Sequence, residues 1–257
     1  MTLQSNVQSK EAIEKVISPY QFFGDGRVVD LMPQLTAAGY NPAGIAFIID
    51  QRQIASTDVR NNFNISLWTG DSAGVDENGG VLLTLDSLLL RQVTHESPLV
   101  NGALKLDHKQ WQELKADREH SLYLNPQEVE AAHEKGYVFK NGLFEPVNEA
   151  VAKAWDFLNK GKEGRDIQSY AQMVSENSFN EDIIDCDHIM NLDFSRKRTC
   201  ARTLRSLVIS CTYNNSNVYS NIRLINSLGR LMGVAPDFYY GKLKKSITKK
   251  WFPLKMY

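Results

Sequence analysis

Cysteine is scarce in this chain, and a disulfide framework is therefore not expected. Only Cys186, Cys200 and Cys211 are present among 257 residues, an odd number confined to one region. No stretch approaches the roughly 20 apolar residues that a transmembrane helix requires, and the first twenty residues lack the pattern of a secretory signal peptide. We therefore expect reduced thiols and a cytoplasmic location.

The composition is also free of the biases that accompany disorder or fibrous structure. Hydrophobic residues make up 42% of the chain and charged residues 23%, which is ordinary for a globular protein. A chain of this length is one large domain or two small ones. We predict an acidic α+β part over residues 1–160 and a basic helical part over residues 161–257, or a single domain that contains both.

Charge is unevenly divided, although the formal net charge of the whole chain is only −1. Residues 196–257 contain 13 of the 29 Lys and Arg and a single acidic residue, Asp237, which gives a formal charge of +12. The remaining 16 basic and 29 acidic residues give residues 1–195 a formal charge of −13. Such asymmetry indicates a polyanionic partner or a surface that binds another part of the same chain.

The N-terminal quarter of the sequence is predicted to be mostly helical. Apolar residues recur at helical spacing up to Pro19, a short helix is expected over residues 30–38, and Asn41-Pro42 has the pattern that opens a third helix. Strand patterns follow at residues 63–68, 81–85 and 103–106. The residues TGDSAGVDENGG between the first two strands are predicted to form a loop.

Helix signals return after residue 107. Asn125-Pro126 followed by Glu128 is a capping box, and Asn148 is predicted to cap another helix. Asn141-Gly142 between two apolar runs predicts a β-hairpin. The expected fold class is α+β, with a small antiparallel sheet flanked by helices and a C-terminal third that is mainly helical.

The stretch RKRTCARTLR, residues 196–205, is interpreted as an amphipathic helix. At about 100° per residue, Arg198, Arg202 and Arg205 fall on one face, while Cys200, Leu204 and other apolar residues fall on the opposite face. This arrangement predicts a cationic stripe. It also indicates that Cys200 and Cys211 act as small apolar residues, which disfavours a zinc site with Cys186 and His188.

A polyanion site is predicted on this basic segment, because aligned Lys and Arg release counterions when they meet phosphates. Aromatic residues among them are able to stack on unpaired bases. The opposing interpretation is that the segment binds the acidic part of the same chain and needs no ligand. The residues assigned to charge are Arg196, Lys197, Arg198, Arg202, Arg205, Lys244, Lys245, Lys249 and Lys250, and those assigned to stacking are Tyr239, Tyr240 and Trp251.

The sequence Asp185-Cys186-Asp187-His188 carries the alternative enzymatic hypothesis. Asp185, Asp187 and His188 have the residue types that hold Mg²⁺ or Mn²⁺ in phosphoryl-transfer sites, and a basic surface nearby would suit a nuclease or phosphohydrolase. No companion Lys or Glu motif supports this. Acidic residues before a basic segment also serve simply to neutralise it.

Two further patterns are weaker. Gly70-Asp71-Ser72-Ala73-Gly74 matches a nucleophile elbow, yet no His precedes Ser72 and the residues that follow cannot form the required helix. Asp71, Asp76, Glu77 and Asn78 supply oxygen atoms, but their spacing is not that of an EF-hand. The other histidines, His95, His108, His120 and His133, are expected at the surface.

We therefore expect a non-catalytic binding or assembly protein without a cofactor. Its basic, aromatic C-terminal region would bind nucleic acid or an acidic protein surface in a larger complex. The metal-dependent enzyme and the internally docked structural protein are the alternatives.

Overall fold

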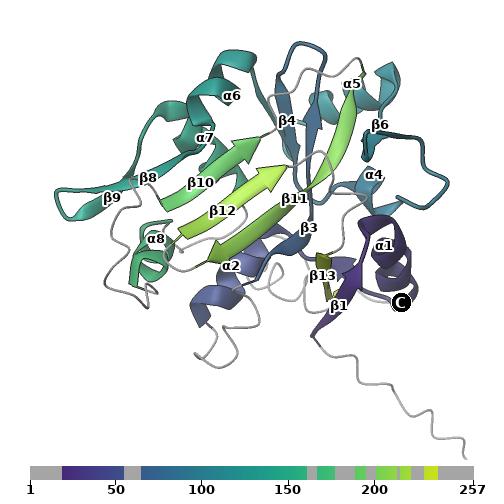
Figure 1. Ribbon diagram of the computed structural model, residues 1–257, viewed down its shortest axis with the longest axis horizontal. Helices are drawn as coiled ribbons and strands as arrows, with labels where there is room; N and C mark the ends of the chain where they lie inside the picture. The colour runs from purple at the N-terminus through teal and green to yellow at the C-terminus, as the bar shows by residue number, and fades with distance from the viewer. Residues whose placement is uncertain are drawn as a thin grey trace, which may run out of the picture.

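The computed structural model describes residues 19–54, 65–160, 167–176, 189–194, 201–212, 215–220 and 229–236 (Figure 1). The helices are α1 (Val28–Ala37), α2 (Ile45–Ile54), α4 (Leu88–Arg91), α5 (His108–Ala116), α6 (Pro126–Ala132), α7 (Glu149–Leu158) and α8 (Ile167–Glu176). The strands are β1 (Tyr20–Gly26), β2 (Asn41–Pro42), β3 (Leu67–Val75), β4 (Val81–Thr84), β5 (Leu99–Val100), β6 (Ala103–Lys105), β7 (Ser121–Leu124), β8 (Lys135–Lys140), β9 (Leu143–Pro146), β10 (Ile189–Phe194), β11 (Thr203–Thr212), β12 (Asn215–Ser220) and β13 (Gly229–Val234).

The thirteen strands among the described residues form one mixed sheet. Its main path runs β1-β13-β3-β11-β12-β10-β8-β9, and the short strands pair beside this path. Most pairs are antiparallel, but β10 pairs with β12 and β13 pairs with β3 in parallel. Strands from before and after residue 160 are therefore neighbours within the same sheet.

This sheet corrects the predicted fold class. The small sheet is wrong, and so is the helical C-terminal third, because residues 189–194, 203–212, 215–220 and 229–234 are strands. The error has a physical cause in β11: Leu204 and Val208 face one core, while Leu207 and Ile209 face the other. A strand buried on both faces is a nearly continuous apolar run, which periodicity alone cannot distinguish from a helix.

Strand β3 lies at the centre of the sheet and is buried along its whole length. It contains the residues GDSAG, so the predicted loop is wrong in its first half, and only the turn after Val75 matches. Small residues are needed here because a Cβ atom on Gly74 would come within 2.8 Å of the Trp111 ring. The strand therefore passes beneath α5 at a distance that only glycine permits.

The local signals at the helix and turn ends are mostly confirmed. Asn125 and Glu128 form the capping box of α6, and Asn148 accepts a hydrogen bond from the Val151 backbone N–H of α7. Asn141 and Gly142 turn between β8 and β9 with φ values of 51° and 85°, as a type I′ hairpin turn requires. Such signals depend only on neighbouring residues.

The predicted helix start at Asn41-Pro42 is wrong, because these residues form β2 and pair with β13. Helix α2 begins at Ile45 instead. Its first N–H group, that of Ile45, donates to Asp71 Oδ2 at 2.6 Å. The cap of this helix therefore comes from β3, 26 residues further along the chain, rather than from the preceding residue.

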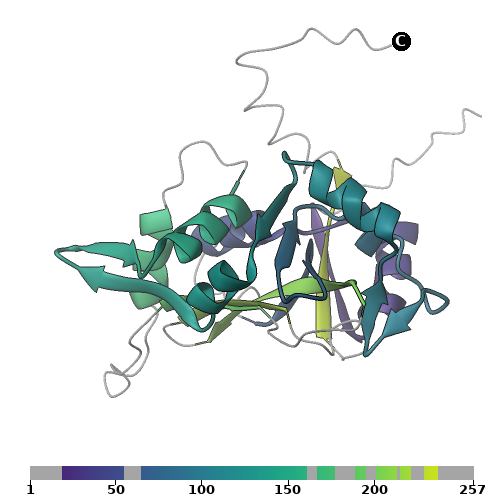
Figure 2. The ribbon, with the colours of Figure 1, turned by 90° about the horizontal axis from the view of Figure 1, so that it is seen from above.

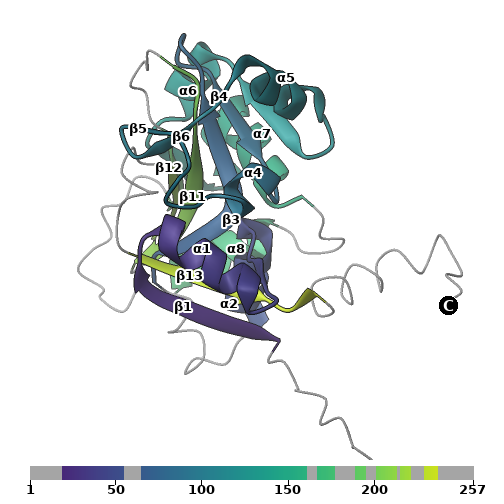
Figure 3. The same ribbon diagram turned by 90° about the vertical axis from the view of Figure 1, so that its right-hand side faces the viewer.

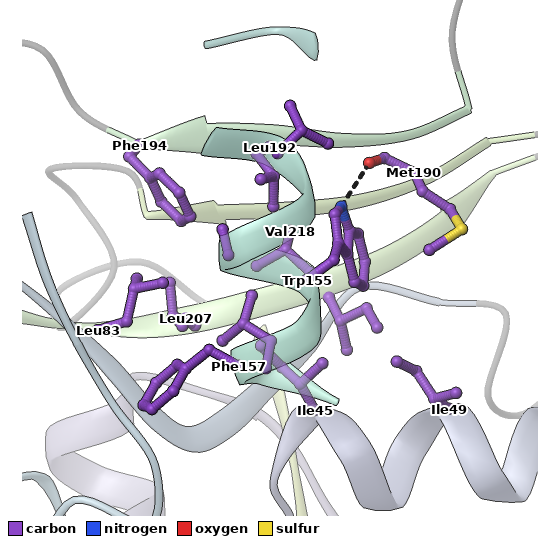
Figure 4. Packing of buried hydrophobic residues seen from close by; sticks show 14 of the residues in the cluster. Ile45, Ile49, Leu83, Trp155, Phe157, Met190, Leu192, Phe194, Leu207 and Val218 are labelled. Atoms are coloured by element: carbon purple, nitrogen blue, oxygen red, sulfur yellow. Dashed lines mark hydrogen bonds between the residues drawn. The ribbon is translucent and has the colours of Figure 1, made fainter. Parts of the chain in front are cut away.

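Two hydrophobic cores lie on opposite faces of the sheet. The larger core joins α2, α6, α7 and α8 to the strands, and Trp155 of α7 donates its indole N–H to the Met190 carbonyl oxygen at 2.8 Å within it (Figure 4). The smaller core joins α1, α4 and α5 to the opposite face. Figure 3 shows α1 beside β1 and β13 at this end of the molecule.

Among the described helices, those that contact β10 and β12 cover one face of these strands only. In Figure 1 the centres of β10 and β12 face the viewer with no described helix in front of them. Figure 2, seen from above, shows that α7 and α2 both lie on the other side of these strands. Inward residues such as Leu192 and Val218 belong to the larger core. The residues that alternate with them therefore point to the uncovered face.

Candidate ligand-binding site

A small polar cavity of about 200 Å³ lies on the uncovered face of β10 and β12. Its lining residues come from two parallel strands and from the turn between α6 and β8. The strand register sets Asp193 beside Tyr219, with Asn191 and Asn217 each two residues earlier on their strands. We call this set, which consists of Glu134, Asn191, Asp193, Asn217 and Tyr219, the acceptor pocket.

Glu134 is held at the pocket by its backbone. Its N–H donates to the Leu192 carbonyl oxygen at 2.7 Å, and its φ of 52° is in the left-handed region, which few residues other than Gly adopt. The adjacent His133 forms a bridge to Leu192 as well. The turn is therefore attached directly to β10, and the Glu134 carboxylate is placed at the edge of the pocket.

Hydrogen-bond acceptors without a donor characterise this pocket. The side-chain oxygens of Asn191 and Asn217 are both buried and have no hydrogen-bond partner. Buried polar atoms are almost always paired, so each exception needs an explanation. Two residues with such oxygens line the same cavity as Glu134 and Asp193, a combination that suits a group that donates hydrogen bonds.

The electrostatics of the pocket are those of two carboxylates near one another. Burial raises the pKa of Asp193, and the negative charge of Glu134 raises it further. His133 lies between them, with Nδ1 3.3 Å from Asp193 Oδ1 and Nε2 3.6 Å from Glu134 Oε1. A positively charged group in the pocket would relieve this repulsion.

His133 was expected at the surface, but its side chain is only 15% exposed. Its Nδ1 is buried without a hydrogen bond of good geometry. The histidine is therefore mostly buried and lies beside both carboxylates of the pocket.

Most residues of the sequence-based site predictions lie outside the described residues. They are Asp185, Cys186, Asp187, His188, Arg196, Lys197, Arg198, Cys200, Tyr239, Tyr240, Lys244, Lys245, Lys249, Lys250 and Trp251. Cys211 lies on β11. The predicted nuclease site and most of the polyanion site therefore stay predictions.

Arg202 and Arg205 are described, and they do not form one cationic stripe. Arg202 donates from Nε to Glu77 Oε2 at 3.1 Å and from Nη1 to His108 Nδ1 at 2.9 Å. Its guanidinium carbon also lies 5.9 Å from the centre of the Trp111 ring, within the range of a cation–π contact. This arginine is thus engaged within the chain.

Arg205 is buried in the sheet and is 2% exposed. Its Nε and Nη1 atoms have no hydrogen-bond partner, and burial lowers its pKa to about 10. It lies on β11 opposite Ala73 of β3. Because the segment is a strand rather than a helix, this residue points into the protein instead of joining Arg202 at the surface.

The GDSAG residues, Gly70 to Gly74, have a structural role as part of β3. Asp71 accepts from Ile45 N at 2.6 Å and from Asp86 N at 2.9 Å, and burial raises its pKa to about 7 against the effects of the Ile45 hydrogen bond and the nearby Arg91. Ser72 is fully buried, and its hydroxyl has no hydrogen-bond partner. The nucleophile would therefore be out of reach of any substrate.

The oxygen atoms suggested for Ca²⁺ are likewise engaged. Asp76 accepts from the backbone N–H groups of Asn78 and Gly80 and from the Tyr123 hydroxyl. Glu77 pairs with Arg202. Within the described ranges, no group of three or more His, Cys, Asp or Glu is arranged to hold a metal ion.

Sequence reasoning missed the acceptor pocket entirely. Residues 189–194 alternate inward apolar with outward polar positions at Asn191 and Asp193, which is a strand signal. That signal was available but short. It gave no indication that β12, more than twenty residues later, would pair in parallel and bring Asn217 and Tyr219 to the same place.

Comparison with known proteins identifies the fold. No family model and no curated protein matches this chain. A solved structure described as "Accommodation of massive sequence variation in Nanoarchaeota by the C-type lectin fold" aligns with a TM-score of 0.53 and 12% sequence identity. The alignment covers 86% of this chain and 99% of that one, so the chain has a C-type lectin-like fold.

This fold similarity agrees with the large mixed sheet of this chain, which contradicts the predicted small sheet. In the part of the chain that the structure describes, every helix is too short or too polar to cross a membrane.

Proposed function

We propose that this chain is a non-catalytic binding protein that receives its ligand in the acceptor pocket. The observation that carries the proposal is the pair of buried, unpartnered amide oxygens on Asn191 and Asn217. Both asparagines line the same cavity as Asp193 and Glu134. A folded protein gains nothing by keeping such acceptors unpaired, whereas a ligand that donates to them would restore the lost hydrogen bonds.

The chemistry of the pocket selects the ligand. Carboxylates and amide oxygens accept hydrogen bonds, so the matching group is a donor that carries positive charge, such as a guanidinium or an ammonium. Tyr219 adds a rigid aromatic ring at the same position. Tyr and Asn side chains are typical of recognition surfaces, because they combine contact area with adaptable hydrogen bonding at a small entropic cost.

The alternation of buried and outward residues along β10 and β12 supports a binding role. On β10 and β12 the residues Leu192 and Val218 are buried in the larger core, while Asn191, Asp193 and Asn217 alternate with them on the uncovered face. The outward positions therefore carry recognition without taking part in the core. The similar structure is described as a case in which the C-type lectin fold accommodates massive sequence variation, and an alternation of this kind tolerates changes on one face of a strand.

Binding of small probes tests the proposal. Methylguanidinium is titrated into the full chain, and the side-chain amide signals of Asn191 and Asn217 are followed by nuclear magnetic resonance. The neutral donor N-methylurea serves as the matched probe without charge. We expect methylguanidinium, but not N-methylurea, to shift these signals.

Two variants locate the binding. Asp193→Asn is expected to weaken it by about ten-fold, which corresponds to about 1.4 kcal/mol. Asp156→Asn removes the same charge from an exposed position on α7 and should leave the affinity unchanged. If neither probe shifts the amide signals, or if both variants weaken binding equally, the acceptor pocket is not the binding site.

Nucleic acid or an acidic protein surface remains a second proposed partner, because residues 196–257 carry 13 basic residues and one acid. Arg202 and Arg205 no longer support it, since the first is paired and the second is buried. The proposal now depends on Arg196, Lys197, Arg198, Lys244, Lys245, Lys249 and Lys250, with Tyr239, Tyr240 and Trp251 for stacking.

Retention of labelled single- and double-stranded nucleic acid at two salt concentrations tests this second partner. Phosphate contacts predict retention that falls steeply with salt. The same assay with Mg²⁺ or Mn²⁺ tests the enzymatic alternative, which requires cleavage that is lost in Asp185→Ala. Absence of retention at low salt would contradict the nucleic-acid proposal.

A further inference from the structure

A groove lined by leucine runs between α4 and α5, on the face of the sheet that carries the smaller core. Its cavity volume is about 440 Å³, and an adjoining cavity of about 350 Å³ shares Leu89 and Gln110 with it. Four leucines contribute to the lining, and one of them, Leu88, is 66% exposed. We call this the leucine groove, and its lining residues are Thr84, Leu85, Asp86, Ser87, Leu88, Leu89, Gln110, Glu113, Leu114, Asp117 and His120.

The charge of the leucine groove is of one sign. Asp86, Glu113 and Asp117 supply three carboxylates, and no Lys or Arg is among the described lining residues. Arg91 engages Asp86, and His120 contacts Asp117 at 3.1 Å. The Glu113 side chain is 65% exposed, and its contact with Lys109 is a loose one of 3.8 Å. An apolar floor with an acidic rim suits an amphipathic, basic segment.

The chain contains such a segment at its C-terminal end. Residues 241–257, GKLKKSITKKWFPLKMY, include six lysines and no acidic residue. Leu243, Ile247 and Trp251 recur at i, i+4 and i+8, which places them within about 80° of one another on a helix. Lys242, Lys245 and Lys249 fall on the opposite side at this spacing, so a helix over these residues would carry an apolar stripe and a cationic face.

The point at which the described chain ends also favours this occupant. Ala235, which is next to the last described residue, belongs to the smaller core, and Leu89 and Leu114 of the leucine groove pack against that same core. Only four residues separate residue 236 from the start of the basic segment. The described chain therefore ends on the side of the sheet where the groove lies.

We propose that residues 241–257 bind in the leucine groove of the same chain, with Leu243, Ile247 and Trp251 on the leucines and the lysines against the acidic rim. The segment has too few apolar residues to form a core alone. Contact with the groove would cover Leu88 and bring lysines near the carboxylates of Glu113 and Asp117. It would also occupy lysines that are otherwise available to a polyanion, so the two modes of binding would compete.

Hydrogen exchange in the full chain, measured by mass spectrometry, tests this contact from both sides. Trp251→Ser is expected to speed exchange in the α5 peptides, and Leu88→Lys to speed exchange in residues 241–257, each by about ten-fold, as lost local protection predicts. Phe139→Lys is the matched control, because Phe139 is 62% exposed on the β8–β9 hairpin. It should change neither region.

Three results would overturn the proposal. Exchange in residues 241–257 of the native chain at the rate of a free peptide of the same sequence would show that the segment is not bound. Unchanged protection of that segment in Leu88→Lys would place it elsewhere. Protection that disappears on dilution would assign the groove to the segment of a second copy.

Discussion

Two oxygen-rich clusters in this protein have similar chemistry and opposite hydrogen-bond status. At the β3–β4 hairpin, Asp71 and Asp76 accept hydrogen bonds from backbone N–H groups and from Tyr123. In the acceptor pocket, the amide oxygens of Asn191 and Asn217 have no partner. The difference teaches that a cluster of oxygen atoms indicates a binding site only where the fold has left those atoms unpaired.

The pH dependence of folding is the largest expected effect of the paired cluster. Burial raises the pKa of Asp71 from its ordinary value of 3.8 to about 7, so the native state holds the proton more tightly than the unfolded chain does. The protonated Asp71 carboxyl therefore contributes to the stability of the native state. This contribution is fully present below about pH 4 and is lost as the pH rises to about 7. The loss in the free energy of unfolding is on the order of 4 kcal/mol.

Urea unfolding of the native chain and of Asp71→Asn across this pH range measures the effect of Asp71. The variant has no carboxyl group, so its free energy of unfolding should lack this decline. Arg91 and Asp86 face the same carboxyl and are unchanged in both proteins. Parallel pH profiles for the two proteins would contradict the prediction.

Loss of a paired acceptor at the hairpin should be the next largest effect. Asp76→Ala leaves the N–H groups of Asn78 and Gly80 and the Tyr123 hydroxyl without their acceptor. We expect the free energy of unfolding to fall by about 2 kcal/mol. Glu77→Ala, which breaks only an exposed ion pair with Arg202, should cost at most about 0.5 kcal/mol. If urea titrations give equal decreases in the free energy of unfolding for Asp76→Ala and Glu77→Ala, the prediction is wrong.

Acidification should weaken ligand binding in the acceptor pocket. The pKa of Asp193 is raised by burial and by Glu134, so its carboxyl becomes neutral at a higher pH than an exposed Asp. Affinity for methylguanidinium should fall by about ten-fold when this group is protonated. His133 faces the same carboxylate, and a His133→Gln variant that keeps the pH dependence would assign it to Asp193. An affinity independent of pH down to about pH 4 would contradict the prediction.

The smallest effect on stability is expected where an acceptor is already unpaired. Asn217→Ala removes an oxygen without a partner, so the free energy of unfolding should change by less than about 0.5 kcal/mol while probe binding weakens. Asn148→Ala is the matched comparison, because Asn148 caps α7, and its loss should cost about 1 kcal/mol. If Asn217→Ala proves the more destabilising of the two, the distinction between the clusters fails.

Part of the fold could be predicted from the sequence, and the correct parts are local. The caps at Asn125 and Asn148 and the turn at Asn141-Gly142 depend on residues close to one another in the chain. The incorrect predictions concern residues whose contacts lie far away in the sequence. Asn41-Pro42 has the pattern of a helix start, but pairing with β13 makes it a strand, and the α2 cap is supplied by Asp71 instead.

The candidate site was less predictable than the fold, for the same reason. The basic stripe assumed a helix, and strand pairing of β11 with β3 and β12 separated Arg202 from Arg205. The acceptor pocket combines residues from positions 134 to 219, and none of its five residues is unusual in its own local sequence. Only their unpaired oxygens make the cavity notable, and pairing is a property of the folded state.

The sequence by itself determined the helix caps, the hairpin turn and the division of charge between residues 1–195 and 196–257, because these depend on neighbouring residues or on simple counts. The tertiary structure decided that the basic region contributes strands, that Arg205 is buried, and that two asparagine oxygens remain without donors. The physical reason is that strand pairing and burial are set by long-range contacts. Those contacts decide which polar groups are satisfied within the chain and which are left for a ligand.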